Sequence, residues 1–250
     1  MDKKSKKVSE LDPNKMPRHI AIILDGNGRW AKKRLLPRQL GHRAGIQALR
    51  RTVEAVDELG IPILTVFAFS TENWKRPLDE VQYLMSLLLE FVDSELRDLH
   101  KNNVKVNLLG NITQLAPLIQ EKLIKATELT INNKGLILNI CINYGGRAEI
   151  LQATRKIAVD VRDGKLDPEQ IDEGLFNSRL YTVGISDPDL LIRTAGEMRL
   201  SNFLLWQIAY AEIWVTDVFW PDFNKSILLK AISDYQKRDR RFGALSKDDS

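Results

Sequence analysis

The stretch HIAIILDGNGRW, residues 19–30, places six mostly apolar residues directly before an aspartate, two glycines and an arginine. A short apolar run of this kind predicts a buried strand over residues 19–24, and the glycines let the backbone pass close to a ligand before a helix begins near Arg29. The carboxylate of Asp25 at this strand end suits a Mg²⁺ ion, which takes one or two carboxylates and completes its shell with water and phosphate oxygens. The same residues also fit a plain helix cap, so this stretch alone leaves both interpretations open.

The rest of the chain repeats the alternation of short apolar runs and longer amphipathic ones. Further strands are predicted at residues 63–69, 104–110, 135–141, 189–192 and 212–217, and helices at 42–59, 78–99, 115–132, 147–163 and 224–241. Asp167 and Pro168 have the N-cap and first-turn chemistry of another helix. This order predicts an α/β fold, a single-domain, mostly parallel sheet flanked by helices. In such sheets ligands bind outside the carboxyl ends of the strands.

The helix predicted from Val81 to Leu99 is apolar around more than one face. Either it is deeply buried or it lines a hydrophobic tunnel between the sheet and the helices. In the strand ILTVFAFS, residues 63–70, side chains alternate between faces, so Ala68 is predicted to lie beneath the polar residues that end this strand. A methyl group there would leave such a passage open.

Charge and composition limit the classes of protein. The chain has 250 residues, 44% of them hydrophobic, and a formal charge of +4, and residues 1–18 hold six Lys or Arg against three Asp or Glu. We therefore expect a flexible basic tail over residues 1–16, one domain over 17–243 and a C-terminal tail over 244–250. The nearly neutral body argues against nucleic acid as a partner.

The single cysteine and the apolar runs point to a reducing compartment and no membrane span. Cys141 lies in the apolar run GLILNICINY, which favours a buried, inert thiol, and the absence of a disulfide pair fits a cytoplasmic location. No stretch reaches the roughly 18 to 20 apolar residues that a membrane span needs.

Two later strand ends carry polar clusters. FSTENWKRP, residues 69–77, combines a hydroxyl, a carboxylate, an amide, an indole and two cations, which a plain turn does not need. RTAGEMRLSN, residues 193–202, places Arg193 and Arg199 around a turn of small residues, with Ser201 close by. Guanidinium groups match phosphate oxygens in forked pairs, although surface salt bridges are the ordinary role of any one arginine.

Several common enzyme classes lack support in the sequence. No His or Cys spacing suits zinc, no Ser-His-Asp series stands out and the Walker lysine motif is absent. DGNG also lacks the third glycine of the dinucleotide-binding fingerprint.

The chain contains, in this order, the motifs DGNGRWA, GHRAG, FSTENWKRP, NYGGR, IRTAGE, LSNFLLWQIAYAE and FWPDF. From Pro17 to Gly243 it closely resembles the cis-prenyltransferases, with the bacterial undecaprenyl diphosphate synthases as the nearest branch. The resemblance implies an Mg²⁺-dependent transferase that repeatedly condenses isopentenyl diphosphate with an allylic diphosphate such as farnesyl diphosphate, forming Z double bonds. It further implies a long product such as undecaprenyl diphosphate for cell-wall glycan synthesis, a homodimer and a peripheral membrane contact for product release.

The resemblance also assigns roles to residues. Asp25 would handle the metal and the allylic diphosphate, Glu212 would be the second metal carboxylate, and Asn73 matches the residue described as proton acceptor. A neutral amide is too weak a base for that step, so we expect Asn73 to orient the isopentenyl group while a diphosphate oxygen or Asp25 takes the proton. The resemblance assigns substrate binding to Gly26, Asn27, Gly28, Arg29, Trp30, Arg38, His42, Ser70, Thr71, Glu72, Trp74, Arg76, Arg193, Arg199, Leu200 and Ser201.

Two alternatives to this function come from other classes. A catalytically silent partner subunit of the same family would typically lose the catalytic residues, whereas this chain keeps Asp25, Asn73 and Glu212. A magnesium-dependent phosphatase could share the strand, aspartate and glycine pattern, but it would release phosphate without joining carbons. Two small departures from the family pattern are Ala195, where a glycine is common, and Ala244, next to the terminal arm Arg241–Gly243 that in relatives reaches across a homodimer.

Overall fold

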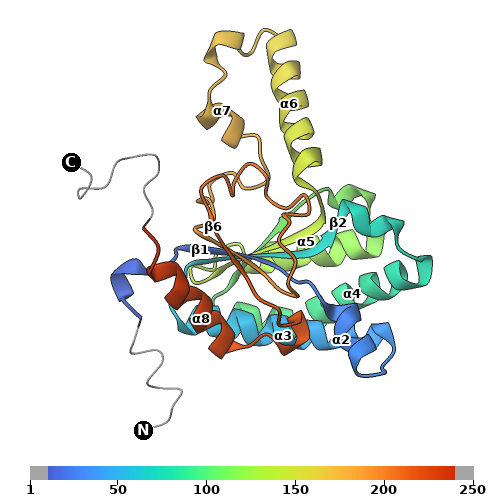
Figure 1. The fold of residues 1–250 in the computed structure, drawn as a ribbon. Helices are drawn as coiled ribbons and strands as arrows, with labels where there is room; N and C mark the ends of the chain where they lie inside the picture. Colours follow the sequence, from blue (N-terminus) through green and yellow to red (C-terminus); the bar gives the residue numbers. More distant parts are fainter. Residues whose placement is uncertain (1–10, 240–250) are drawn as a thin grey trace, which may run out of the picture.

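The structure, a computed structural model, describes residues 11–239 and has a six-stranded parallel sheet at its centre (Figure 1). Across the sheet the strands run in the order β3-β4-β2-β1-β5-β6. Their bounds are β1 (His19–Ile23), β2 (Ile63–Ser70), β3 (Lys105–Leu109), β4 (Ile137–Tyr144), β5 (Leu190–Arg193) and β6 (Glu212–Val215). The predicted parallel α/β sheet is confirmed.

The helices also follow the predicted pattern closely. Their bounds are α2 (Asn27–Lys33), α3 (Arg38–Glu58), α4 (Leu78–Lys101), α5 (Pro117–Thr130), α6 (Gly146–Arg162), α7 (Glu173–Asn177) and α8 (Lys225–Gln236). The 3-10 turns are η1 (Pro13–Lys15), η2 (Thr71–Lys75), η3 (Ile112–Gln114), η4 (Pro168–Gln170) and η5 (Trp220–Asp222). The helix expected to begin at Asp167 is only the turn η4, although Asp167 does cap it.

Alternation along the strands divides the core between the two faces of the sheet. Ile20 and Ile22 pack into a large cluster with apolar residues of α3, α4, α5 and α8, whereas Ala21 and Ile23 point to the other face. There Cys141 is fully buried, and burial, with the nearby charge of Glu149, raises the pKa of its thiol well above the ordinary value. The predicted burial of the thiol is confirmed.

The second face is covered differently from the first. On this face the strand side chains are covered by residues of the irregular segment 200–211, among them Phe203, Leu204 and Ile208. Helix α6 rises away from this face, and its far part and α7 project from the body of the molecule (Figure 1). Only the first face therefore has the full helical layer that the strand and helix alternation predicts.

The connections put a topological switch point beside β1. After β1 the chain adds β2 on one side, and much later it adds β5 on the other, with Ile23 paired to Arg193 in the β1–β5 register. Open parallel sheets bind ligands in the crevice at the carboxyl ends of such strands. The site is therefore expected where Asp25 follows β1.

Strand β2 is irregular near its carboxyl end. Its register against β4 shifts between Phe67 and Phe69 and again before Ser70. Phe67 packs on the second face, Phe69 belongs to the first, and Ala68 between them is exposed. The bulge turns Ala68 toward the open space at the strand end instead of into closed core.

The chain ends differ in part from the expected boundaries. Residues 11–16 belong to the expected flexible tail, but Leu11 and Met16 pack against the core, and the side chain of Gln236 exchanges hydrogen bonds of 3.1 and 2.8 Å with the Asp12 backbone. The terminal helix ends at Gln236, and the arm Arg241–Gly243 and Ala244 lie outside the described residues. No helix of residues 11–239 is long and apolar enough to cross a membrane.

Candidate active site

A pocket of about 750 Å³ opens at the carboxyl ends of β1, β2 and β5. Its charged lining consists of six cations and two carboxylates: Arg29, Lys32, Arg38, Arg76, Arg193, Arg199, Asp25 and Glu72. A volume of 300 to about 1,000 Å³ is typical of small-molecule sites, and the excess of cations selects for an anion.

Gly26 shapes the Asp25 loop, and no other residue type fits at this position without strain. Gly26 has φ = 101°, and a Cβ there would lie 2.8 Å from Phe219 Cδ1 and 2.9 Å from Ala195 Cβ. The Thr194 hydroxyl fixes the same loop, accepting from the Asp25 N–H at 2.9 Å and donating to its carbonyl at 2.7 Å. Gly26 also caps α2 without a side-chain hydrogen bond, which leaves the first-turn amides of α2 available to an anion.

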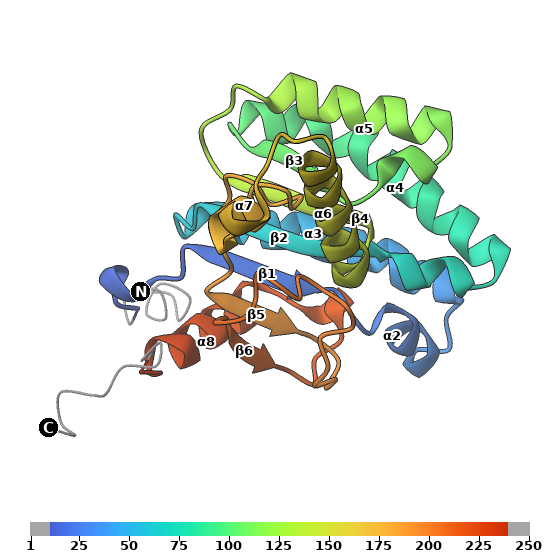
Figure 2. The ribbon, with the colours of Figure 1, turned by 90° about the horizontal axis from the view of Figure 1, so that it is seen from above.

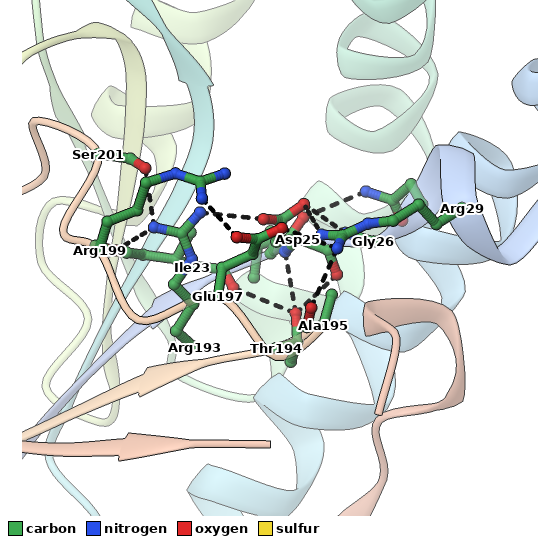
Figure 3. A network of polar contacts seen from close by, with 12 residues as sticks. Ile23, Asp25, Gly26, Arg29, Arg193, Thr194, Ala195, Glu197, Arg199 and Ser201 are labelled. Atoms are coloured by element: carbon green, nitrogen blue, oxygen red, sulfur yellow. Dashed lines mark hydrogen bonds and ion pairs between the residues drawn. The ribbon is translucent and has the colours of Figure 1, made fainter. Parts of the chain in front are cut away.

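The Asp25 carboxylate lies between two arginines. Arg29 approaches Oδ1 at 3.1 Å, and Arg193 donates to Oδ2 at 3.0 Å (Figure 3). Burial alone would raise the pKa of Asp25, but the Arg193 hydrogen bond and the charges of both arginines lower it below its ordinary value. Asp25 is therefore an anion at neutral pH, and the arginines beside it are oriented before any ligand arrives.

The two arginines continue into the turn after β5. Arg193 also donates to Ser201 Oγ at 2.8 Å and to the Arg199 carbonyl, and its side chain is only 5% exposed. Arg29 contacts Glu197 at 2.8 Å, and Glu197 in turn pairs with Arg199 (Figure 3). Arg199 is the more accessible of the predicted pair, whereas Arg193 is buried and already bonded within the protein.

The turn beside Arg193 has unusual backbone angles. Ala195, where relatives often have glycine, adopts φ = 69°, and Ser201 and Asn202 have φ of 50° and 64°. Side chains other than glycine are disfavoured at such angles, so alanine keeps the turn with a modest penalty. The Ala195 N–H donates to the Val218 carbonyl at 2.9 Å, which helps to hold this turn.

A second cluster of predicted residues is organised by Glu80. Its Oε1 lies 3.1 Å from Arg38 Nε, 3.2 Å from His42 Nε2 and 2.9 Å from Arg76 Nη1. Burial, assisted by the charges of Arg76 and Arg38, lowers the pKa of His42 although Glu80 opposes the shift. This buried carboxylate holds the first turns of α3 and α4 together and positions two arginines at the pocket.

The loop η2 is held in shape by a reciprocal cap. Asn73 Oδ1 accepts the Ser70 N–H at 3.0 Å, and the Ser70 side chain accepts the Asn73 N–H. Glu72 accepts a 2.8 Å hydrogen bond from Asn202, which links η2 to the turn after β5. Burial would raise the pKa of Glu72, but the Asn202 bond and nearby donors lower it. The Asn73 oxygen is thus used within the loop, which leaves its NH₂ group for a ligand.

Most predicted substrate-binding residues line this pocket: Gly26, Asn27, Gly28, Arg29, Arg38, His42, Ser70, Glu72, Arg76, Arg193, Arg199 and Ser201, together with Asp25 and Asn73. The other four are sequence neighbours of lining residues but do not line the pocket themselves. Trp30 Nε1 donates to Asp222 at 2.8 Å and Trp74 Nε1 to Asn143 Oδ1 at 2.8 Å, and Leu200 packs on the core of the second face. Thr71 lies against Gly145, where a Cβ would meet its Oγ1 at 2.6 Å.

Glu212 lies elsewhere in the chain. It begins β6, pairs with Leu190 at the start of β5 and contacts Arg238 at 2.6 Å, whereas Arg193 at the far end of β5 faces Asp25. The two predicted metal carboxylates are therefore at opposite ends of the strands. One chain does not bring Glu212 and Asp25 to a common ion.

Several residues of the site are absent from the sequence-based prediction. Lys32 and Asn202 line the pocket, Glu80 and Glu197 pair with its arginines, and Thr194 holds the Asp25 backbone. Three of them stand within quoted motifs, as the Thr and Glu of IRTAGE and the Asn of LSN. Glu80 follows Arg76 by one helical turn, which is the spacing of an ion pair.

The pocket fits a magnesium ion only together with a phosphate ligand. Among residues 11–239 no three His, Cys, Asp or Glu side chains gather to hold an ion. Asp25, ionised and partly open to the pocket, would supply one ligand, and Mg²⁺ completes its shell with phosphate oxygens and water. The surrounding cations suit the phosphate that such binding needs.

An apolar cavity of about 100 Å³ adjoins the pocket between β2 and helices α3 and α4. Leu24, Ala68 and Leu84 line both spaces, and Leu88 and Phe91 lie deeper in the cavity. The tunnel expected for a long chain stays a prediction, but an apolar path lies where it would begin.

Fold and site together define a class: a parallel α/β protein with a cation-lined pocket at its switch point, beside an apolar cavity. A family model described as putative undecaprenyl diphosphate synthase matches residues 23–243. The chain belongs to this family, the cis-prenyltransferases, and is a prenyltransferase.

Individual relatives agree with this assignment. The isoprenyl transferase of Heliobacterium mobile is 54% identical over 236 residues, which cover 94% of this chain and 91% of that protein. The isoprenyl transferase of Geobacillus kaustophilus is 55% identical over 231 residues, 92% of this chain and 90% of that protein.

Solved structures agree as well. Lavandulyl diphosphate synthase from Lavandula x intermedia, in complex with dimethylallyl diphosphate, matches with a TM-score of 0.90 and 38% identity over 92% of this chain and 99% of that one. A probable undecaprenyl diphosphate synthase from Campylobacter jejuni matches with a TM-score of 0.75 and 33% identity over 91% of this chain and 98% of that one.

Proposed function

We propose that this prenyltransferase condenses isopentenyl diphosphate repeatedly with an allylic diphosphate, with farnesyl diphosphate as starter. The observation that carries the proposal is the pairing of a pocket lined by six cations with an apolar cavity that shares Ala68 and Leu84 with it. A diphosphate group needs the cation-lined pocket, and a prenyl chain needs the apolar cavity. The lavandulyl diphosphate synthase, whose solved structure holds dimethylallyl diphosphate, supports an allylic diphosphate as ligand.

The reaction requires a bond to break before the carbons join. The allylic C–O bond breaks, its electron pair leaves with the diphosphate, and the double bond of isopentenyl diphosphate attacks the resulting cation. A proton is then lost from the adjacent carbon, and diphosphate is released. Arg29 and Arg38 provide positive charge for the departing diphosphate, and donors already oriented before reaction give the largest electrostatic effect.

Mg²⁺, held by Asp25 and phosphate oxygens, would supply further positive charge to the leaving group. The protein side of the site is prepared for this: the depressed pKa of Asp25 keeps the carboxylate ionised. Apolar walls at Ala68 and Leu84 keep water from the allylic cation.

We further propose that Asn73 orients the isopentenyl group and does not accept the proton. Its Oδ1 accepts the Ser70 N–H at 3.0 Å, so the end left for a ligand is an NH₂ donor. A pH-rate profile of Asn73→Asp tests this role. We expect strongly reduced turnover at every pH, and activity restored as the new carboxylate ionises would show that this position acts as a base.

The function itself is tested by incubating the full chain with farnesyl and isopentenyl diphosphates and Mg²⁺ and weighing the lipid products. We expect a ladder of longer prenyl diphosphates that disappears on chelation. Phosphate release without carbon–carbon bond formation would support a magnesium-dependent phosphatase instead. No turnover, with enhancement of an active relative on mixing, would support a partner subunit.

The remaining features follow from the family resemblance and stay predictions. We propose undecaprenyl diphosphate as product, a role in cell-wall glycan synthesis, a homodimer, a cytoplasmic location and a peripheral membrane contact during release. The names of the family model and of the Campylobacter jejuni neighbour support the product length.

A further inference from the structure

The loop from α2 to α3 contains a leucine in a backbone conformation that favours glycine. Leu35 has φ = 56° and is 95% exposed. Its N–H donates to the Lys32 carbonyl at 3.1 Å, and the Leu36 N–H donates to the Ala31 carbonyl at 3.0 Å. These two bonds are those of a Schellman helix end, and Leu35 occupies the left-handed position at which glycine is by far the commonest residue.

Two features of Leu35 oppose the stability of the folded chain. A side chain in the left-handed region crowds its own backbone, and an isobutyl group exposed to water does not contribute the favourable free energy that its burial would provide. A single exposed leucine is ordinary, but here the side chain contributes no burial that offsets the strain. Strain of this kind, held by the surrounding structure, points to a role outside the chain's own fold.

The surroundings of Leu35 indicate what it meets. Residues 32–40, KKRLLPRQL, are all exposed and combine four cations and three leucines with no carboxylate. Arg34 pairs with Asp222 and Arg38 with Glu80, so the two lysines provide most of the unneutralised charge. The Arg38–Glu80 pair brings the start of α4 to this loop, and its first residue, Leu78, is 72% exposed.

We propose that this surface, the leucine loop of residues 32–40, docks on an anionic lipid bilayer. Leucines at a loop tip enter the interface while the lysines face the lipid phosphates, each cation adding to the attraction. Charge complementarity favours this occupant over a second copy of the chain, since the loop carries no carboxylate to meet its own lysines.

The leucine loop lies beside the mouth of the pocket, which connects docking to the use of the pocket. Lys32 and Arg38 also line the pocket, and α2 with its loop lies at one margin of the molecule (Figure 2). Docking would hold the pocket mouth at the membrane surface. This purpose rests on the proposed function, whose product is a membrane lipid, whereas the docking itself is measured without substrate.

The test is co-sedimentation of the full chain with vesicles of phosphatidylcholine containing about one third phosphatidylglycerol, and with phosphatidylcholine alone. We expect the wild type to bind the anionic vesicles and to lose binding at high salt. Leu35→Asn, which tolerates the left-handed angle, should bind about 10-fold more weakly and melt at an equal or higher temperature. Leu35→Met keeps an apolar side chain and should bind as the wild type does.

Two further variants separate charge from apolar contact. Lys33→Gln should weaken binding to the anionic vesicles about 5-fold, as expected for one cation near such a surface. Leu118→Ser changes a leucine that is 56% exposed on α5 and should leave binding unchanged, because it lies away from the leucine loop.

Three results would overturn the proposal. They are absence of wild-type binding to anionic vesicles, equal binding by Leu35→Asn, and a change of oligomeric state in Leu35→Asn on sedimentation analysis, which would assign the loop to a protein interface. Vesicle binding is read without substrate and prenyl products are read without vesicles. A failure of docking, which would also count against the membrane contact proposed above, is therefore distinguishable from a failure of the proposed reaction.

Discussion

The amino and carboxyl halves of the sheet hold their polar side chains in opposite ways. Toward the amino end, a ladder of neutral hydrogen bonds crosses from β3 to β1: Asn107 to Asn139 at 3.1 Å, Asn139 to Thr65 at 2.9 Å and Thr65 to His19 at 2.7 Å. At the carboxyl end, Asp25 and the arginines around it are ionised and line an open pocket.

The hydrogen-bond partners in the ladder determine which nitrogen of His19 carries the proton. His19 Nδ1 lies 2.6 Å from the Ser186 carbonyl, which only accepts, so Nδ1 carries the proton and Nε2 accepts from Thr65. Burial lowers the pKa of His19 to about 4, although Ser186 and Asp189 favour its charged form. The groups of this ladder bond one another within the protein, whereas the carboxyl end keeps charge that a ligand can use.

The largest expected effect comes from removing the charge of Asp25. Asp25→Asn should lower turnover about 10²-fold to 10³-fold, the usual loss for one electrostatic contact at a reacting centre. Asparagine is preferable to alanine, because it leaves an acceptor for the buried Arg193, which donates to Asp25 at 3.0 Å. Steady-state kinetics and a melting curve together check this, and turnover within a few-fold of wild type would remove Asp25 from the mechanism.

Variants of Glu212 and Asp25 test whether these two carboxylates form one site from two copies of the chain. In one chain Glu212 and Asp25 are at opposite ends of their strands, so a metal role for Glu212 requires a second copy. Glu212→Gln and Asp25→Asn chains, each nearly inactive alone, should recover about a quarter of wild-type turnover when refolded together, because half of the dimers have one intact site. No recovery would show that Glu212 supports only its own chain.

A substitution at Ala68 tests the apolar side of the pocket. Ala68→Leu should shift products toward shorter prenyl diphosphates, because the added carbons fill the space where pocket and apolar cavity meet. The first condensation should stay comparatively fast, since Arg29 and Arg38 are unchanged. Mass spectrometry of the products checks this, and an unchanged length distribution from a less stable protein would place Ala68 in ordinary core.

The smallest effect is expected at the amino end, and it concerns stability alone. The unfolded chain binds a proton at His19 below about pH 6.5, whereas the folded chain resists it down to a pKa of about 4. Unfolding free energy should therefore fall as the pH drops from 6.5 to 4, by at most on the order of 3 kcal/mol. Urea unfolding of His19→Gln should show a shallower fall over this range, with turnover at neutral pH nearly unchanged.

Local patterns in the sequence predicted much of the fold. The strands predicted from the apolar runs begin and end within about three residues of the observed strands, because burial on both faces of a parallel sheet requires continuous apolar residues. The turn η4, predicted as a helix, shows the limit: Asp167 caps it, but no apolar stripe follows to pack a longer helix.

The sequence by itself determined which residues gather at the carboxyl ends of the strands, since Asp25 and Arg193 each end or follow a buried run. Only the tertiary structure decided how they are used. It bound Arg193 inside the protein, made Glu80 the partner of Arg38 in α3 and of Arg76 after η2, and placed Glu212 away from Asp25. The physical reason is that strand and helix periodicity are local properties, whereas an ion pair depends on the order and direction in which distant strands and helices are packed.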